Sequence, residues 1–171
     1  MGFFTGGSSP SQFTIGELMN IDNTRQQKAG ACKVELVKVF HELQNESLLN
    51  KFKAGLFGRN TINTYYLILK FKVTSDTGSE HKVYVRLSPD FNMNAYLNNK
   101  IKIYCDCEDF KYRTAYTLGK RDSVFLSNIV KTKLGPSLTE PPRKQYTTLL
   151  CKHSYAVLNW LIDNYAAIMK S

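Results

Sequence analysis

Two short residue pairs in the sequence carry side chains that bind metal ions. Cys105 and Cys107 are separated by one residue, and Cys151 and His153 repeat that spacing after an interval of 43 residues. Three sulfurs and one imidazole form one of the usual tetrahedral zinc shells built only from protein ligands. On a strand, side chains two residues apart lie on the same side, so one ion can be reached by both. The spacing therefore predicts a structural Zn²⁺ site at Cys105, Cys107, Cys151 and His153.

Two other interpretations of these cysteines stay open. Free cysteine often behaves as a small buried hydrophobic residue, and Cys105 and Cys107 continue an apolar row. A disulfide between one of them and Cys151 is the second alternative, and it requires an oxidising compartment. The remaining cysteine, Cys32, has no partner nearby in the sequence and is expected to be a thiol in the core.

Composition places the chain among globular proteins. Its 171 residues are 43% hydrophobic and 22% charged, which is typical of one soluble domain. We expect no membrane partner, because no apolar run is long enough to cross a bilayer and the N-terminus lacks the pattern of a signal peptide. The expected setting is the cytoplasm, where paired cysteines more often hold a metal than each other.

Alternating apolar and polar residues predict a small antiparallel sheet. Residues 65–73 and 83–87 form the clearest pattern, a hairpin with one buried face and one polar, basic face, joined by an Asp-Thr-Gly turn. Residues 101–107 extend the sheet and place the first cysteine pair in a core-facing row. Residues 32–40 also alternate, but the apolar phase slips at Val37, which predicts a strand with a bulge or a bend.

Helical periodicity follows the sheet. A first helix is expected after Cys107, ending at Gly119 because glycine commonly terminates helices. A second helix is expected from Cys151 to the C-terminus, with an apolar stripe at helical spacing. A helix N-terminus stabilises a nearby thiolate, which favours Cys151 as a metal ligand. The predicted fold class is α+β: a small antiparallel β-sheet followed by two helices, with a zinc site joining the last strand to the C-terminal helix.

The first 30 residues differ from the rest. We expect residues 1–30 to form an extended N-terminal arm and residues 31–171 to form a single zinc-stapled domain. A Gly-Ser-Pro stretch gives the arm flexibility, and residues 15–21 are expected to form a short helical turn. The arm is predicted to dock onto another chain, with packing on its own domain as the alternative, through its apolar residues Phe3, Phe4, Phe13, Ile15 and Leu18.

The two ligand pairs resemble the SWIM zinc-finger pattern, CxC followed at long range by CxH. That resemblance covers about residues 60–165 and implies a strand–strand–helix arrangement around the zinc. Residues 104–113, 150–158 and 83–89 are, more narrowly, similar to small structural virion proteins of tailed bacteriophages such as the crAss-like phages.

The phage resemblance implies a non-enzymatic structural protein at the head or head–tail connector. Its partners would be other virion proteins or copies of itself, and it would be made in the host cytoplasm and located in the virion. No small-molecule substrate is expected, because the sequence has no phosphate loop, nucleophile elbow or HExxH motif. A zinc shell closed by four protein ligands also leaves no position for a reacting water.

The alternative function is a nucleic-acid-binding module of the SWIM type. The formal net charge of +9 suits a polyanionic partner, although it suits simple solubility equally well. Contacts with nucleic acid or with an acidic partner are expected, if they occur, at basic residues in and after the first helix, which are otherwise a solvated face: Lys111, Arg113, Lys120, Arg121, Arg143 and Lys144.

Overall fold

A computed structural model describes residues 11–20, 23–43, 65–126, 134, 141 and 149–170. Within these residues, four strands form one antiparallel sheet in the order β1-β2-β3-β4. The strands are β1 (Lys33–Leu43), β2 (Tyr65–Thr74), β3 (Glu80–Leu87) and β4 (Ile101–Cys105). The helical elements are α1 (Ile15–Met19), α2 (Asn23–Gly30), the 3₁₀ helix η1 (Met93–Asn98), the π-helical η2 (Phe110–Thr114), α4 (Ala115–Lys120) and α5 (Lys152–Ile168). The α+β class predicted from the sequence is confirmed.

The predicted hairpin is the centre of the sheet. β2 and β3 pair from Leu67 with Leu87 to Thr74 with Glu80. The turn between them requires a left-handed residue, and Gly78 supplies it with φ of 81°. The alternation of buried residues along both strands gives the sheet one apolar face and one polar face.

The edge strand β1 carries the bulge that the sequence predicted. Its register against β2 shifts between Leu36 and Lys38. Val37, the inserted residue, is 49% exposed. The shift keeps apolar residues on the core face of β1 after the bulge, so Val34 and Val39 pack against the core from the same strand.

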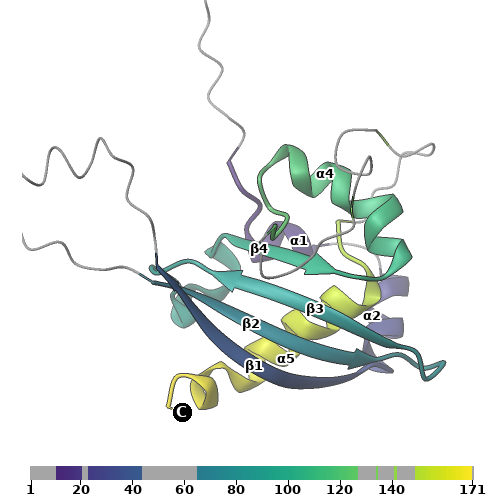
Figure 1. The fold of residues 1–171 in the computed structure, drawn as a ribbon, viewed down its shortest axis with the longest axis horizontal. Helices are drawn as coiled ribbons and strands as arrows, with labels where there is room; N and C mark the ends of the chain where they lie inside the picture. Colours follow the sequence, from purple (N-terminus) through teal and green to yellow (C-terminus); the bar gives the residue numbers. More distant parts are fainter. Residues whose placement is uncertain are drawn as a thin grey trace, which may run out of the picture.

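Helix α5 covers the apolar face of the sheet, as Figure 1 shows with the strands drawn in front of the helix. Phe71 and Val85 are fully buried on the sheet side, and Leu158 and Leu161 are fully buried on the helix side. Trp160 meets Phe71 edge to face, with ring centroids 5.3 Å apart. Among the described helices, none combines the length and apolar character needed to cross a membrane.

The N-terminal segment packs on its own domain. Phe13 is 7% exposed, while Ile15 and Leu18 are completely buried within the core. Helix α1 begins with a capping box in which Thr14 and Glu17 exchange side-chain and backbone hydrogen bonds. The prediction that Phe13, Ile15 and Leu18 dock onto another chain is therefore wrong, because the apolar surface that covers them belongs to this chain.

Arg121 holds this segment in place. Its guanidinium lies 3.7 Å from the centre of the Phe13 ring and donates to the Ser11 carbonyl oxygen at 2.6 Å and to the Glu17 carboxylate at 3.2 Å. Five N–H donors in a rigid plane allow one arginine to join several groups in this way. The other two apolar residues assigned to the arm, Phe3 and Phe4, lie outside the described residues.

Candidate metal centre

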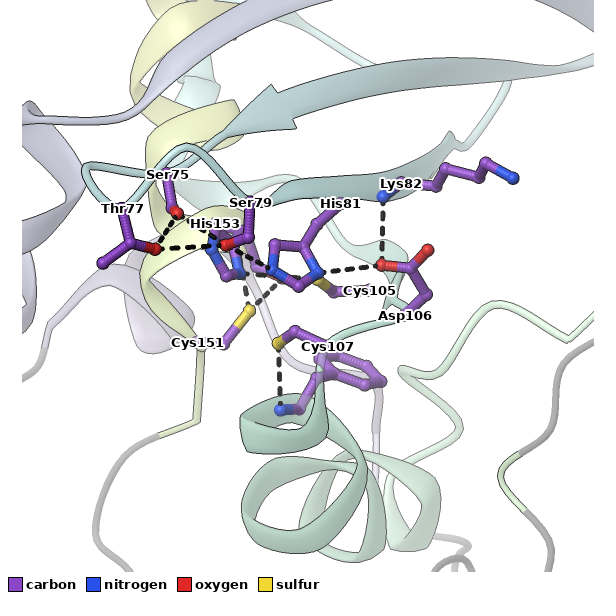
Figure 2. A network of polar contacts seen from close by, with 12 residues as sticks. Ser75, Thr77, Ser79, His81, Lys82, Cys105, Asp106, Cys107, Cys151 and His153 are labelled. Atoms are coloured by element: carbon purple, nitrogen blue, oxygen red, sulfur yellow. Dashed lines mark hydrogen bonds and ion pairs between the residues drawn. The ribbon is translucent and has the colours of Figure 1, made fainter.

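The structure brings the four predicted ligands together. The potential ligand atoms of Cys105, Cys107, Cys151 and His153 all lie within 4.8 Å of one another. Figure 2 shows these side chains turned toward one another between the end of β4 and the beginning of α5. All four side chains are buried, the most exposed of them at only 4%. The predicted convergence is confirmed.

Local structure places each pair. Cys105 is the last residue of β4 and pairs with Val83 of β3. The strand was expected to continue to Cys107, but regular pairing ends at Cys105. The Asp106 backbone N–H still donates to the Lys82 carbonyl oxygen at 3.2 Å, whereas the Lys82 N–H donates to the Asp106 carboxylate at 3.0 Å. Cys107 consequently lies at the turn into η2, and its side chain still reaches the cluster.

Backbone amides at two helix beginnings point at two of the sulfurs. The Phe110 N–H donates to the Cys107 sulfur at 3.3 Å, and the Ser154 N–H donates to the Cys151 sulfur at 3.4 Å. Cys151 is the N-cap of α5, which confirms its predicted position at the start of the helix. Hydrogen bonds to a sulfur favour its charged form, so both arrangements suit thiolate ligands.

The sulfurs compete for negative charge. Burial raises the pKa of the Cys105 thiol well above its usual value. The pKa of Cys107 is also raised: its hydrogen bond with Cys105 opposes the rise, but the neighbouring Cys151 and burial outweigh it. For Cys151, burial is opposed and outweighed by hydrogen bonds from Cys105, Cys107, His153 and Ser154, so its pKa is lowered. Only a bound cation would allow all three thiols to ionise together.

Spacing and chemistry fit a tetrahedral zinc. Zn–S bonds of about 2.3 Å and Zn–N bonds of about 2.0–2.1 Å place neighbouring ligand atoms roughly 3.6–3.8 Å apart. The Cys105 sulfur and the His153 Nδ1 atom are 3.9 Å apart. His153 Nε2 is buried without a hydrogen-bond partner among the described residues. One ring nitrogen fills one position of a tetrahedral shell, and Nδ1, which lies beside the Cys105 sulfur, is the nitrogen placed to do so.

His81 is a second histidine that the sequence reasoning missed. Its ring lies against His153, with centroids 4.1 Å apart, while its Nδ1 and Nε2 atoms lie 3.3 Å from Asp106 Oδ1 and Ser79 Oγ. Figure 2 shows this chain of contacts leading from the β2–β3 turn to the cluster. The sequence did contain a signal for its position. His81 is two residues before Val83, so both side chains lie on the face of the sheet that carries Cys105.

One ion pair ties the same turn to the start of α5. The Lys152 ammonium lies 2.6 Å from the Asp76 carboxylate. This contact lowers the pKa of Asp76 and raises that of Lys152. It holds the segment between Cys151 and His153 against the β2–β3 hairpin, and so brings the second ligand pair to the first.

The basic residues proposed to bind nucleic acid do not form one free surface in the described part of the chain. Arg113 is paired with Asp109 at 3.0 Å, and Arg121 is engaged by the N-terminal segment. Lys111 lies over the ring of Tyr112 and Lys120 over the ring of Tyr116. Arg143 and Lys144 lie outside the described residues, so a contact of this set with a partner stays a prediction.

Comparison with known proteins gives no relative. No family model, no curated protein and no solved structure matches the chain.

Proposed function

We propose that this protein is a non-enzymatic, zinc-stapled structural protein. The observation that carries the proposal is the buried set of Cys105, Cys107, Cys151 and His153. Four protein ligands complete a tetrahedral shell, and catalytic zinc sites instead keep one position open for water or substrate. A zinc here would join β4 to α5 and fix the helix against the sheet.

The finer proposal is that the chain is a component of a tailed-bacteriophage virion, at the head or head–tail connector. It is supported by the resemblance of residues 83–89, 104–113 and 150–158 to small virion proteins of that kind. Its partners would be other virion proteins or copies of itself. The buried positions of Phe13, Ile15 and Leu18 take these three residues out of a docking arm, while Phe3 and Phe4 lie outside the described residues.

Exposed apolar residues at the end of the sheet away from the metal centre support an assembly surface. Leu43 and Tyr65 face each other across β1 and β2 and are 46% and 48% exposed. Beside them is a hollow of about 200 Å³ lined by Leu67, Phe91 and Met169, among others. Large exposed apolar residues gathered in one place commonly mark protein contacts.

Particles purified from infected cells test the virion assignment. The chain should sediment with intact particles and be present in a fixed ratio to the capsid protein, as measured by quantitative mass spectrometry. Substituting Leu43→Ser together with Tyr65→Ser should reduce that incorporation while leaving the isolated protein folded and metal-bound. Recovery of the unmodified chain only from the soluble fraction would contradict the assignment, whatever the metal content.

A further inference from the structure

The face of the sheet opposite α5 carries an unusual arrangement of charges. We define the open face as the outward side chains of β1–β3. Figure 1 shows no described helix drawn across this side of the three strands. These residues alternate with the buried ones on the same strands. They include two carboxylates, with Glu35 opposite Lys72 and Glu42 paired with Arg86 at 3.6 Å. They also include a set of cations and aromatic rings: Lys38, Phe40, Tyr66, Lys70, Lys72, Lys82, Tyr84 and Arg86.

Like charges face each other directly on the open face. The register pairs Lys38 with Lys70 and pairs Lys72 with Lys82. Like charges in directly opposite positions of an antiparallel sheet are destabilising. Lys72 is compensated by Glu80 at 2.6 Å, but the described residues provide no carboxylate partner for Lys38, Lys70 or Lys82. A local arrangement that opposes folding is more often found at functional sites than elsewhere.

Aromatic rings are interleaved with these cations. Lys70 pairs with Tyr84, which in turn pairs with Tyr104, so one row across the sheet runs from Lys38 through Lys70 to two tyrosines. Lys38 lies 4.7 Å from the centre of the Phe40 ring, and Arg86 lies 4.1 Å from the centre of the Tyr66 ring. Phe40, Tyr66 and Tyr84 are each half-buried, which leaves part of each ring at the surface.

We propose that the open face binds single-stranded nucleic acid. Uncompensated lysines attract the phosphates, and partly exposed rings offer surfaces on which unpaired bases stack. The combination of lysines and aromatic rings favours a single strand over a duplex, because the bases of a duplex are already stacked on each other. It also favours a single strand over an acidic protein, which has no bases to stack on the rings. This surface is separate from the metal centre and does not depend on the virion assignment.

Fluorescence anisotropy with the zinc-loaded full chain and a labelled oligothymidylate of about 20 nucleotides tests the proposal. The triple substitution Lys38→Gln, Lys70→Gln and Lys82→Gln should weaken binding at low salt. The slope of log affinity against log salt should become shallower by about 2, because each phosphate contact on a single strand contributes about 0.7. The melting temperature should stay the same or rise, because the substitutions remove like-charge repulsion.

A matched triple variant controls for net charge. Lys28, Lys100 and Lys170 are exposed and lie off the open face, and changing all three to Gln should leave most of the binding. Equal loss in the two triple variants would overturn the proposal, because it would mean attraction by overall charge alone. Absence of binding by the unmodified chain at low salt would overturn it as well.

Two single substitutions test base stacking. Tyr84→Leu and, independently, Phe40→Leu should each weaken oligothymidylate binding by about tenfold. Neither should change the weak binding of polyglutamate, which has charge but no bases. If polyglutamate competes as well as the oligonucleotide, the occupant is an acidic chain and the proposal fails. If duplex DNA of the same length binds more tightly than the single strand, it fails too.

Discussion

The imidazole rings of His81 and His153 lie one against the other, with centroids 4.1 Å apart and planes inclined by 33°. His81 is in turn held between Ser79 and Asp106. Asp106 is the residue between the first two cysteines, so one short network fixes a ligand from α5 and the turn that carries the ligands from β4. The metal centre is therefore supported by residues that cannot be recognised from a ligand motif.

Removal of His81 should weaken metal binding without removing a ligand. Residues that orient metal ligands typically change affinity by 10- to 100-fold, and we expect His81→Ala to lower zinc affinity within that range. His81→Phe keeps a ring against His153 but loses both polar contacts, so an intermediate affinity is expected. Competition with a chromophoric chelator measures the effect. Glu80→Gln, at the neighbouring residue whose side chain contacts Lys72 instead, is the control, and equal losses in the Glu80 and His81 variants would contradict the orienting role.

Loss of one ligand should remove the metal. Purified protein should contain about one zinc per chain, and Cys107→Ser should contain little or none by elemental analysis. Because structural zinc contributes roughly 10–16 kcal/mol of binding free energy in peptides at neutral pH, the variant should also melt at a lower temperature. Cys32→Ser is the matched control, since Cys32 is not among the four clustered ligands and its thiol donates to the Lys28 carbonyl oxygen at 3.6 Å. Metal loss from the control alone would contradict the assignment.

The N-terminal segment should contribute to folding rather than to assembly. Phe13→Ala should lower the free energy of unfolding by about 3–5 kcal/mol, because it removes a ring buried beneath Arg121. Leu126→Ala, at a side chain that is 51% exposed, should change it by less than about 0.5 kcal/mol. Urea denaturation of the zinc-loaded variants measures both values. A Phe13 variant as stable as the unmodified chain would restore the arm as a candidate for docking elsewhere.

Glu17 should make part of this stability depend on pH. A hydrogen bond from the Thr14 backbone N–H lowers the pKa of the Glu17 carboxyl; burial opposes that shift and Arg121 assists it. Because the folded pKa is lower than the unfolded value of about 4.3, the contribution is fully present above that pH and is lost as pH falls through the folded pKa.

Comparison of the unmodified chain with Glu17→Gln isolates this contribution. The stability difference between them should be under about 1 kcal/mol at neutral pH, because the pair is exposed and screened by solvent, and it should shrink below about pH 4. Acid also displaces metal from both proteins, so only the difference between them is informative. A difference that grows on acidification would contradict the proposed contacts.

The ligand set, the hairpin and the bulge were predictable because each depends on neighbours in the sequence. The repeated spacing of the two ligand pairs is visible in the sequence, even though Cys107 lies beyond the end of β4, and Gly78 marks its own turn. His81 was not predictable as a support, because its contact with His153 requires both the register of β3 against β4 and the docking of α5. Short-range patterns do not contain that information.

The N-terminal segment shows a different limit of prediction from the sequence. The apolar character of Phe13, Ile15 and Leu18 correctly indicates burial, but burial does not reveal which chain provides the covering surface. Arg121 holds the segment on its own domain through contacts with residues more than 100 positions away in the sequence. The polar helix α2 was missed for a related reason: its described residues include only one buried side chain, Ala29, and so give almost no periodic signal.

X-ray absorption spectroscopy at the zinc edge, on protein purified without added metal, tests whether Cys105, Cys107, Cys151 and His153 hold zinc. We expect bound zinc with three sulfur neighbours at about 2.3 Å and one nitrogen neighbour at about 2.0–2.1 Å. A zinc shell made mainly of oxygen, or purified protein that holds no metal and in which these cysteines are joined by a disulfide, would contradict it.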